Sequence, residues 1–394
     1  MARKSWTECG FMSVTFPKGF TASGVAAGLN KAEKKDVAVV VNKGPNFDAA
    51  AVFTKNKVKA APVIWTQQVI KNKKLKAILL NSGGANACTG PEGFADTHRS
   101  AEHMAQKLSI GAVEIGVCST GIIGNRLDMP NLISGINKAI ESLTQDGGND
   151  AAEAILTTDS HAKQSIFEIN GWRIGSMIKG AGMLAPDMAT MLCVITTDAD
   201  LSDINLDSAL KHVTDKTLNR IDSDGCTSTN DTVILMASGA SNVKPSIKDF
   251  QDALMVVMSD LSLQLINDAE GASKVIKIEV INTVSENDAV NVGRSIARNN
   301  LLKCAMFGED PNWGRILAAV GNSEAHLDSN LIDVKLNSVL VCKNGSSLSK
   351  GILVDLSKRE IDILVDLHMG DESAVIYTND LSNQYVHENS AYST

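Results

Sequence analysis

Short runs of apolar residues recur along the chain, separated by segments in which apolar positions repeat every three or four residues. The short runs are rich in Val and Ile with little polar alternation, which is typical of strands covered on both faces. They are Val37–Val41, Ala77–Leu80, Ile115–Cys118, Met191–Thr196, Thr232–Ala237, Val275–Val280, Leu331–Leu336 and Ile361–Val365. The other segments predict helices over Asp96–Leu108, Leu132–Leu143, Asp207–Asn219, Lys248–Ile266 and Asp288–Met306. The pattern therefore predicts an α/β protein with strands packed between helical layers.

Composition places the chain among ordinary globular proteins. It has 394 residues, of which 44% are hydrophobic and 21% charged, and a chain of this length can bury a large core. The length indicates two or three domains, or one large sandwich with an appended lobe. The formal net charge of −8 excludes broad attraction to nucleic acids or anionic membranes. It leaves room for a local basic pocket that binds a small carboxylate.

The cysteine pattern favours a reducing compartment. The count of Cys is seven, an odd number, and no pair has the CxxC spacing, so neither a disulfide framework nor a zinc site is expected. The seven His form no HxxxH or HExxH pattern, and we expect no bound metal. The first residues lack the apolar run of a secretory signal, and no window approaches the length of a membrane span. We expect a cytoplasmic protein.

The most informative stretch is the string KGAGMLAPDMATML, which runs from Lys179 to Leu192. Its glycines allow unusual backbone angles and its proline stiffens the loop. Thr190 lies near the end of this string, directly before the apolar run that predicts a strand. A Thr at a strand start is usually structural, because its branched Cβ suits strands. Here the Ala189–Thr190 junction also suits a chemical role, because a hydroxyl follows a flexible loop.

That role is self-cleavage followed by nucleophilic catalysis. The Thr190 hydroxyl could attack the Ala189 carbonyl to give an ester, which water hydrolyses. The product is an N-terminal Thr whose α-amine, with a pKa of about 7.7–8.0, can act as a base near neutral pH. A threonine hydroxyl beside an N-terminal amine is one of the known forms of an activated nucleophile.

Several strings in order along the chain, this one included, resemble the ornithine acetyltransferase family, the glutamate N-acetyltransferases of the cyclic arginine pathway. The central string fits the family pattern K-G-x-G-M-[LI]-x-P-x-M-A-T-M-L. The others are Pro17–Gly28, Asn81–Gly90, Cys118–Gly124 and Phe307–Ile316. The resemblance implies an αββα-type layered sandwich of the N-terminal-nucleophile kind with a smaller C-terminal lobe. It also implies cleavage into fragments 1–189 and 190–394, with Thr190 as the exposed nucleophile.

The resemblance assigns further residues to the reaction centre. The Thr120 hydroxyl and the Gly121 N–H would form the oxyanion hole, while Lys179 and Thr157, the latter preferred over Thr158, would bind substrate. On sequence alone each has an ordinary alternative. The residues after Cys118 could form a simple turn, Lys179 could be a solvated loop lysine, and the threonines could cap a helix.

Three more residues are assigned to substrate binding by the same resemblance. Glu270 would face the substrate amino group, which is a sensible ion pair for the ammonium group of ornithine. Asn389 and Thr394 would reach the substrate from the C-terminus. Without the resemblance, Glu270 would read as a helix-end carboxylate and the last residues as a frayed tail.

The implied reaction is a ping-pong transfer of acetyl from N2-acetyl-L-ornithine to L-glutamate, in arginine biosynthesis, without a cofactor. Acetyl-CoA is a possible second donor, which would make the enzyme bifunctional. Family enzymes commonly contain two copies of each fragment, and no nucleic-acid or membrane partner is expected. Two alternatives stay open: an amidohydrolase or aminopeptidase on the same nucleophile architecture, and a non-catalytic amino-acid-binding or scaffold protein that has kept the fold.

Overall fold

The computed structural model describes residues 13–30, 34–185, 191–348 and 353–391. These residues form two compact units. The larger unit takes its described residues from 1–180, 187–218 and 227–265, and the smaller unit takes its own from 181–186, 219–226 and 266–394. The predicted fragment boundary at 189/190 does not coincide with a border between the two units, and it stays a prediction.

The larger unit contains two sheets. The first has the order β1-β2-β4-β5, in which only the last pair is parallel. Its strands are β1 (Phe20–Val25), β2 (Val37–Asn42), β4 (Ala77–Asn81) and β5 (Ile115–Ser119). The second has the order β3-β9-β8-β7-β6, with β8 and β9 parallel and the other pairs antiparallel. Its strands are β3 (Asp48–Phe53), β6 (Lys163–Ile169), β7 (Trp172–Lys179), β8 (Leu192–Thr197) and β9 (Thr232–Ala237).

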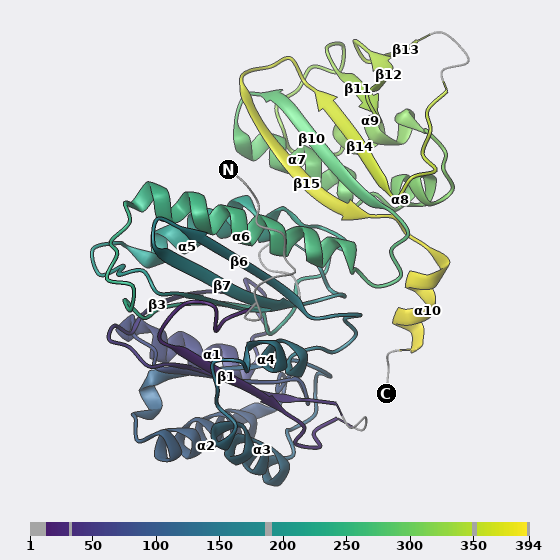
Figure 1. The fold of residues 1–394 in the computed structure, drawn as a ribbon. Coiled ribbons are helices and arrows are strands. Elements are labelled where there is room, and N and C mark those ends of the chain that lie inside the picture. Colours follow the sequence, from purple (N-terminus) through teal and green to yellow (C-terminus); the bar gives the residue numbers. More distant parts are fainter. Residues whose placement is uncertain (1–12, 31–33, 186–190, 349–352, 392–394) are drawn as a thin grey trace. The chain divides into compact units, whose positions relative to one another are not determined.

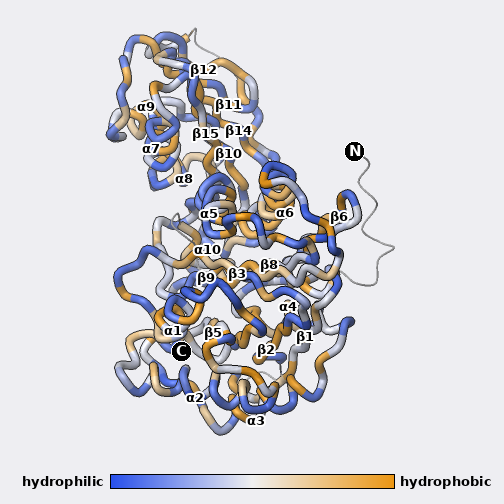
Figure 2. The backbone as a smooth tube through the Cα atoms, turned by 90° about the vertical axis from the view of Figure 1, so that its left-hand side faces the viewer, coloured by the Kyte–Doolittle hydropathy of each residue, from blue (hydrophilic) through white to orange (hydrophobic). Residues whose placement is uncertain are grey.

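These two sheets face each other and bury a shared apolar core. At Gly116 of β5, an added Cβ would lie 3.3 Å from the side chain of Ile234 on β9, so the strands pack closely there. Residues of both sheets belong to one buried cluster. Every residue of β2, β4, β5, β8 and β9 is buried, as expected for inner layers. Figure 2 shows the hydrophobic colouring of β2 and β5.

Helices pack against both sheets (Figure 1). The helices against the first sheet are α1 (Ala61–Val69), α2 (Gly90–Leu108), α3 (Met129–Glu141) and α4 (Gly148–Ala154). Trp65 of α1 donates its ring N–H to the Ile115 carbonyl of β5 at 3.0 Å. Against the second sheet lie α5 (Leu206–Lys216) and α6 (Ile247–Asn267), where Phe250 meets Trp172 of β7. The short 3-10 helices are Ile70–Asn72, Ala112–Glu114 and Leu218–Arg220. The predicted αββα layering is confirmed.

The smaller unit is built on a six-stranded sheet of order β13-β12-β11-β14-β10-β15. Its strands are β10 (Val275–Thr283), β11 (Asp333–Leu336), β12 (Val339–Lys343), β13 (Ser346–Ser347), β14 (Glu360–Asp366) and β15 (Glu372–Asn379). Its helices are α7 (Glu286–Ala297), α8 (Asn300–Phe307), α9 (Trp313–Gly321) and α10 (Asn383–Ala391). It has its own buried core, so the predicted smaller C-terminal lobe is confirmed.

One predicted element is wrong. The segment Asp288–Met306 is not a single helix but α7 followed by α8. Asn299 separates them, because its extended backbone leaves the helical range and its side chain accepts the Leu302 N–H at the start of α8. An Asn in this position is a common helix N-cap. The other predicted helices and strands fall on observed elements.

Replacing Ile78 tests the two-sheet core. Ile78 lies in β4, which is paired with β2 and β5. It is fully buried and belongs to the apolar core of the larger unit. The variant Ile78→Ala should lower the free energy of unfolding by about 2–5 kcal/mol, because it leaves a cavity. The matched control is Ile64→Ala, since Ile64 on α1 is 39% exposed. Urea unfolding followed by circular dichroism measures both, and an equal loss in the two variants would contradict this account of the core.

Candidate active site

Three residues predicted for the site meet in the larger unit. Lys179 is the last residue of β7 and is buried rather than solvated, with a side chain only 2% exposed. Its Nζ donates to Thr157 Oγ1 at 2.7 Å and to Thr120 Oγ1 at 3.5 Å. Thr120 directly follows β5, and Thr157 follows α4. Side chains from three segments far apart in the sequence therefore meet beside the ends of β5 and β7.

Asp159, which the sequence did not single out, organises this cluster. Its Oδ1 accepts from Lys163 Nζ at 2.7 Å and from the Gly180 N–H at 2.6 Å. Its Oδ2 accepts the Thr157 N–H at 3.2 Å and lies 3.6 Å from Lys179 Nζ. Burial would raise the pKa of Asp159, but the charges of Lys179 and Lys163 outweigh it and hold that pKa well below its usual range.

The turn after β5 has a geometry that requires glycine. The Thr120 N–H donates to the Asn81 carbonyl at 2.9 Å, and the Thr120 carbonyl accepts the Gly84 N–H at 3.0 Å. Gly121 has φ of +133°, and an added Cβ would lie 2.8 Å from the backbone of Gly84. Thr120 itself is buried. The turn thus holds a hydroxyl and a backbone N–H in one fixed place, which suits stabilisation of an oxyanion.

A buried carboxyl anchors the chain just before β8. Asp231 Oδ1 accepts the Met191 N–H at 3.1 Å. Burial raises the pKa of Asp231 well above its usual range, which favours the neutral form. Met191 is the residue after Thr190. Thr190 and Ala189 lie outside the described residues.

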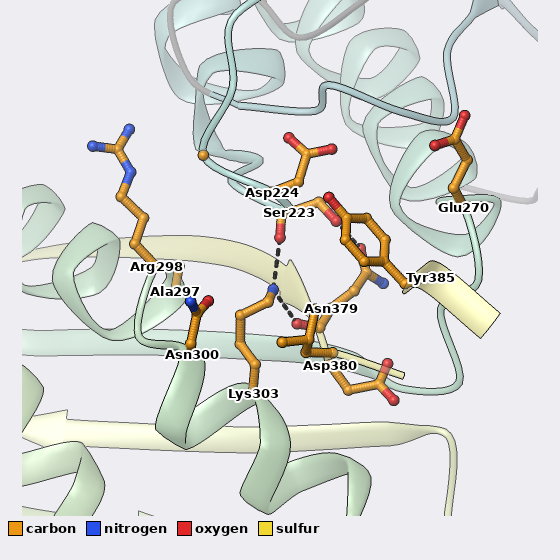
Figure 3. Close-up of a pocket in the computed structure, with 12 residues that line it drawn as sticks. Ser223, Asp224, Glu270, Ala297, Arg298, Asn300, Lys303, Asn379, Asp380 and Tyr385 are labelled. Carbon is orange, nitrogen blue, oxygen red and sulfur yellow. Dashed lines mark hydrogen bonds between the residues drawn. The ribbon is translucent and has the colours of Figure 1, made fainter. Parts of the chain in front are cut away.

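The smaller unit contains Glu270 at the edge of a cavity of about 420 Å³ (Figure 3). The residues lining it are Ser223, Asp224, Gly225, Glu270, Ala297, Arg298, Asn300, Lys303, Asn379, Asp380, Leu381 and Tyr385. Burial, together with the negative charges of Asp224 and Glu270, raises the pKa of Tyr385 to about 12. The Glu270 carboxylate also packs against Gly182, where any Cβ would overlap it. This part of the cavity is therefore electronegative.

Lys303 lies at the opposite side of the same cavity. Its Nζ donates to the Ser223 carbonyl at 2.6 Å, to Thr378 Oγ1 at 3.0 Å and to the Asn379 carbonyl. Burial lowers its pKa to about 8. Its bonds to backbone carbonyls mark it as a structural lysine that ties the segments around the cavity together.

Of the two residues predicted to reach the substrate from the C-terminus, Asn389 alone lies within the described residues. Asn389 lies on α10, is exposed, and donates its side-chain N–H to the Tyr385 carbonyl at 3.0 Å. The last turn before residue 392 is thus helical rather than frayed. Glu270 and Asn389 both belong to the smaller unit. Thr394 lies outside the described residues.

Within the described residues, no group of three or more His, Cys, Asp or Glu could hold a metal ion. The same residues contain no helix both long and apolar enough for a membrane span. Their cysteines are free thiols, at 88, 118, 193, 226, 304 and 342.

Comparisons with known proteins identify the family. The ArgJ family model matches residues 21–394. The arginine biosynthesis bifunctional protein ArgJ of Streptomyces coelicolor is 56% identical over 383 residues, covering 97% of this chain and all of the relative. That of Mycobacterium leprae is 51% identical over 389 residues, covering 97% of this chain and 96% of the relative. The chain belongs to the ArgJ family. It is an acyltransferase of arginine biosynthesis, as the resemblance in its sequence predicted.

Two solved structures are also similar. The ornithine acetyltransferase of Mycobacterium tuberculosis, complexed with ornithine, is 51% identical and has a TM-score of 0.44, covering 46% of this chain and 96% of that chain. The ArgJ protein of Bacillus halodurans is 32% identical with a TM-score of 0.46, covering 50% of this chain and 97% of that chain.

Replacing Gly121 tests the turn after β5. The variant Gly121→Ala should lower kcat for acetyl transfer by about 100-fold, because the added methyl group must displace the turn that holds Thr120. Gly124→Ala is a matched control, since Gly124 also has a positive φ, +93°, but nothing lies within 4 Å of an added Cβ. The measurement is the initial rate of acetyl transfer by each variant, compared with that of the wild type. Equal rates in the two variants would show that the turn geometry is not needed.

Proposed function

We propose that this chain transfers the acetyl group of N2-acetyl-L-ornithine to L-glutamate through an ester on Thr190. The observation that carries the proposal is the contact of buried Lys179 with both Thr157 and Thr120. It joins a cation that can bind a carboxylate to a hydroxyl suited to an oxyanion. Membership in the ArgJ family supports the same reaction.

The proposed cleavage site lies in the connection between two paired strands. β7 and β8 are antiparallel neighbours from Ile174↔Thr197 to Lys179↔Leu192. A cut at Ala189–Thr190 therefore removes no strand from the sheet. Fragments 1–189 and 190–394 would stay joined by this ladder and by the apolar core around it.

The proposed chemistry uses groups of the chain alone. Thr190 Oγ attacks the acetyl carbonyl, and the α-amine of Thr190 accepts the hydroxyl proton. The Thr120 hydroxyl and the Gly121 N–H donate to the oxygen that becomes negative. The C–N bond breaks, the leaving nitrogen of ornithine takes the proton from the Thr190 α-ammonium, and ornithine leaves. The glutamate amine then attacks the Thr190 ester, and N-acetylglutamate leaves.

In the proposal, a cationic residue binds the carboxylate of the substrate and an anionic residue binds its ammonium group. Lys179 binds the donor carboxylate as a point charge, and Thr157, which holds the Lys179 ammonium at 2.7 Å, contributes its hydroxyl. Glu270 binds the ammonium group of ornithine, which the electronegative cavity beside it supports. Asn389 and Thr394 complete the substrate contacts by resemblance to the family.

The names of the relatives call them bifunctional. We include in the proposal a second donor, acetyl-CoA, which would acetylate glutamate by the same ester. Two copies of each fragment would form the enzyme. Free thiols at the described cysteines support a cytoplasmic location.

The variant Thr190→Ala tests the nucleophile. Wild-type protein should appear on a denaturing gel as two fragments, of 189 and 394 − 189 = 205 residues. Thr190→Ala should remain one uncut chain without acetyl transfer, because it lacks the attacking oxygen. Thr190→Ser, which keeps a hydroxyl, should still be cut.

Two fragments from Thr190→Ala would contradict the proposal. Measurement of acetate against N-acetylglutamate separates transfer from hydrolysis. Acetate release that is unchanged by glutamate would favour the amidohydrolase alternative, whereas an uncut and inactive wild-type chain would favour a scaffold.

A further inference from the structure

The candidate catalytic groups come from two different sheets. Thr120 and Gly121 follow β5 of the first sheet, whereas Met191, next to Thr190, precedes β8 of the second. Oxyanion donors work only when they sit within a fraction of an ångström of their position, because a misplacement of about 1 Å can cost 100-fold in rate. The two sheets must therefore be held in register at this end.

Asn230 bridges the two sheets at the required end. It lies in the segment that leads into β9 of the second sheet, two residues ahead of Thr232, and is buried. Its side-chain Nδ2 donates to the Ser119 carbonyl at 2.8 Å and to the Ala85 carbonyl at 2.6 Å. Ser119 is the residue before Thr120. Both donor hydrogens of one amide are thus used on backbone carbonyls of β5 and of the loop that follows β4.

The bridge reaches both sides of the turn. Ala85, the second acceptor, donates its own N–H to the Ile122 carbonyl at 3.1 Å, just beyond Gly121. Asn230 therefore holds the residue before the turn directly and the residue after it through Ala85. The carbonyl oxygen of the same amide accepts the Thr229 hydroxyl at 2.6 Å, which fixes the amide orientation.

The next residue extends the bridge to β8. Asp231 accepts the Met191 N–H at 3.1 Å, and β8 and β9 run parallel from Leu192↔Thr232. One dipeptide, Asn230-Asp231, is therefore bonded to the turn after β5 and to the residue that follows Thr190. All of these partners belong to the larger unit.

We infer that Asn230 is a positioning residue, which fixes the distance between the oxyanion turn and the strand that begins after Thr190. It does not touch the reacting atoms and acts through Ser119 and Ala85. The inference rests on the proposed function, because it takes Thr120 and Gly121 as the oxyanion donors.

The variant Asn230→Ala tests this role. It should lower kcat by about 100-fold with KM within about threefold, because a displaced turn weakens interactions made in the transition state. Rates are referred to the amount of cut enzyme, read from a denaturing gel. Asn230→Ser, which keeps one donor, should lie between Asn230→Ala and wild type and serves if the Ala variant does not fold.

The chain offers a matched control at the far end of β9. Asn42 is also buried and also bridges the two sheets, since its Nδ2 donates to the Ala237 carbonyl at 3.1 Å and to the Asn46 carbonyl at 3.0 Å. Asn42→Ala removes the same kind of bridge at the end opposite the turn. It should lower the unfolding midpoint as Asn230→Ala does but leave kcat near that of wild type.

A double-variant cycle decides whether Asn230 acts through the turn. Thr120→Ala removes one oxyanion donor and should lower kcat by about 100- to 1000-fold. If Asn230 positions the turn that holds both donors, the variant with both changes should be slower than Thr120→Ala alone, because the Gly121 N–H is still misplaced, but its loss of kcat should be clearly smaller than the product of the two single losses. Multiplied losses, a loss in KM only, or an equal fall of kcat in Asn42→Ala would overturn the inference. A wild-type enzyme that fails to transfer acetyl from N2-acetylornithine would instead overturn the proposed function.

Discussion

Burial of the Lys179 ammonium is the constraint on which the site depends. A buried cation is costly unless partners receive its hydrogens and balance its charge. Asp159 supplies the charge at 3.6 Å, and Thr157 supplies an acceptor at 2.7 Å. Because Asp159 also binds the Gly180 N–H, the group that holds the lysine also fixes the first residue of the connection that the proposal cuts. Charge balance and backbone position are therefore coupled.

The layered fold is compatible with the proposed cut between β7 and β8. Two sheets whose inner strands are buried, held together by one apolar core, supply the rigidity, and the proposed reaction groups lie near strand ends. Bridges such as Asn42 and Asn230 keep the sheets in register at both ends of β9. The connection between β7 and β8 can then change chemically without any change in the sheet that it joins.

Sequence patterns predicted the inner strands because buried strands are continuously apolar, as in β2 and β9. They missed β6, whose residues KQSIFEI mix charges with apolar positions. They also gave Lys179 a solvated alternative, because burial of a lysine depends on a partner distant in the chain. The candidate oxyanion and substrate-binding residues came from the resemblance to the family. Asp159 and Asn230 could not be predicted this way, since their function lies in bonds to backbone groups that leave no periodic pattern.

During the proposed transfer the acetyl group resides on Thr190. Wild-type enzyme mixed briefly with N2-acetyl-L-ornithine, quenched in acid and digested can be mapped by tandem mass spectrometry. The account predicts one acetyl group, ester-linked, on the first residue of the 190–394 fragment, and its loss when glutamate is added before the quench. Acetyl transfer at the full rate with no acetyl on that residue, or with acetyl on another side chain, would contradict it.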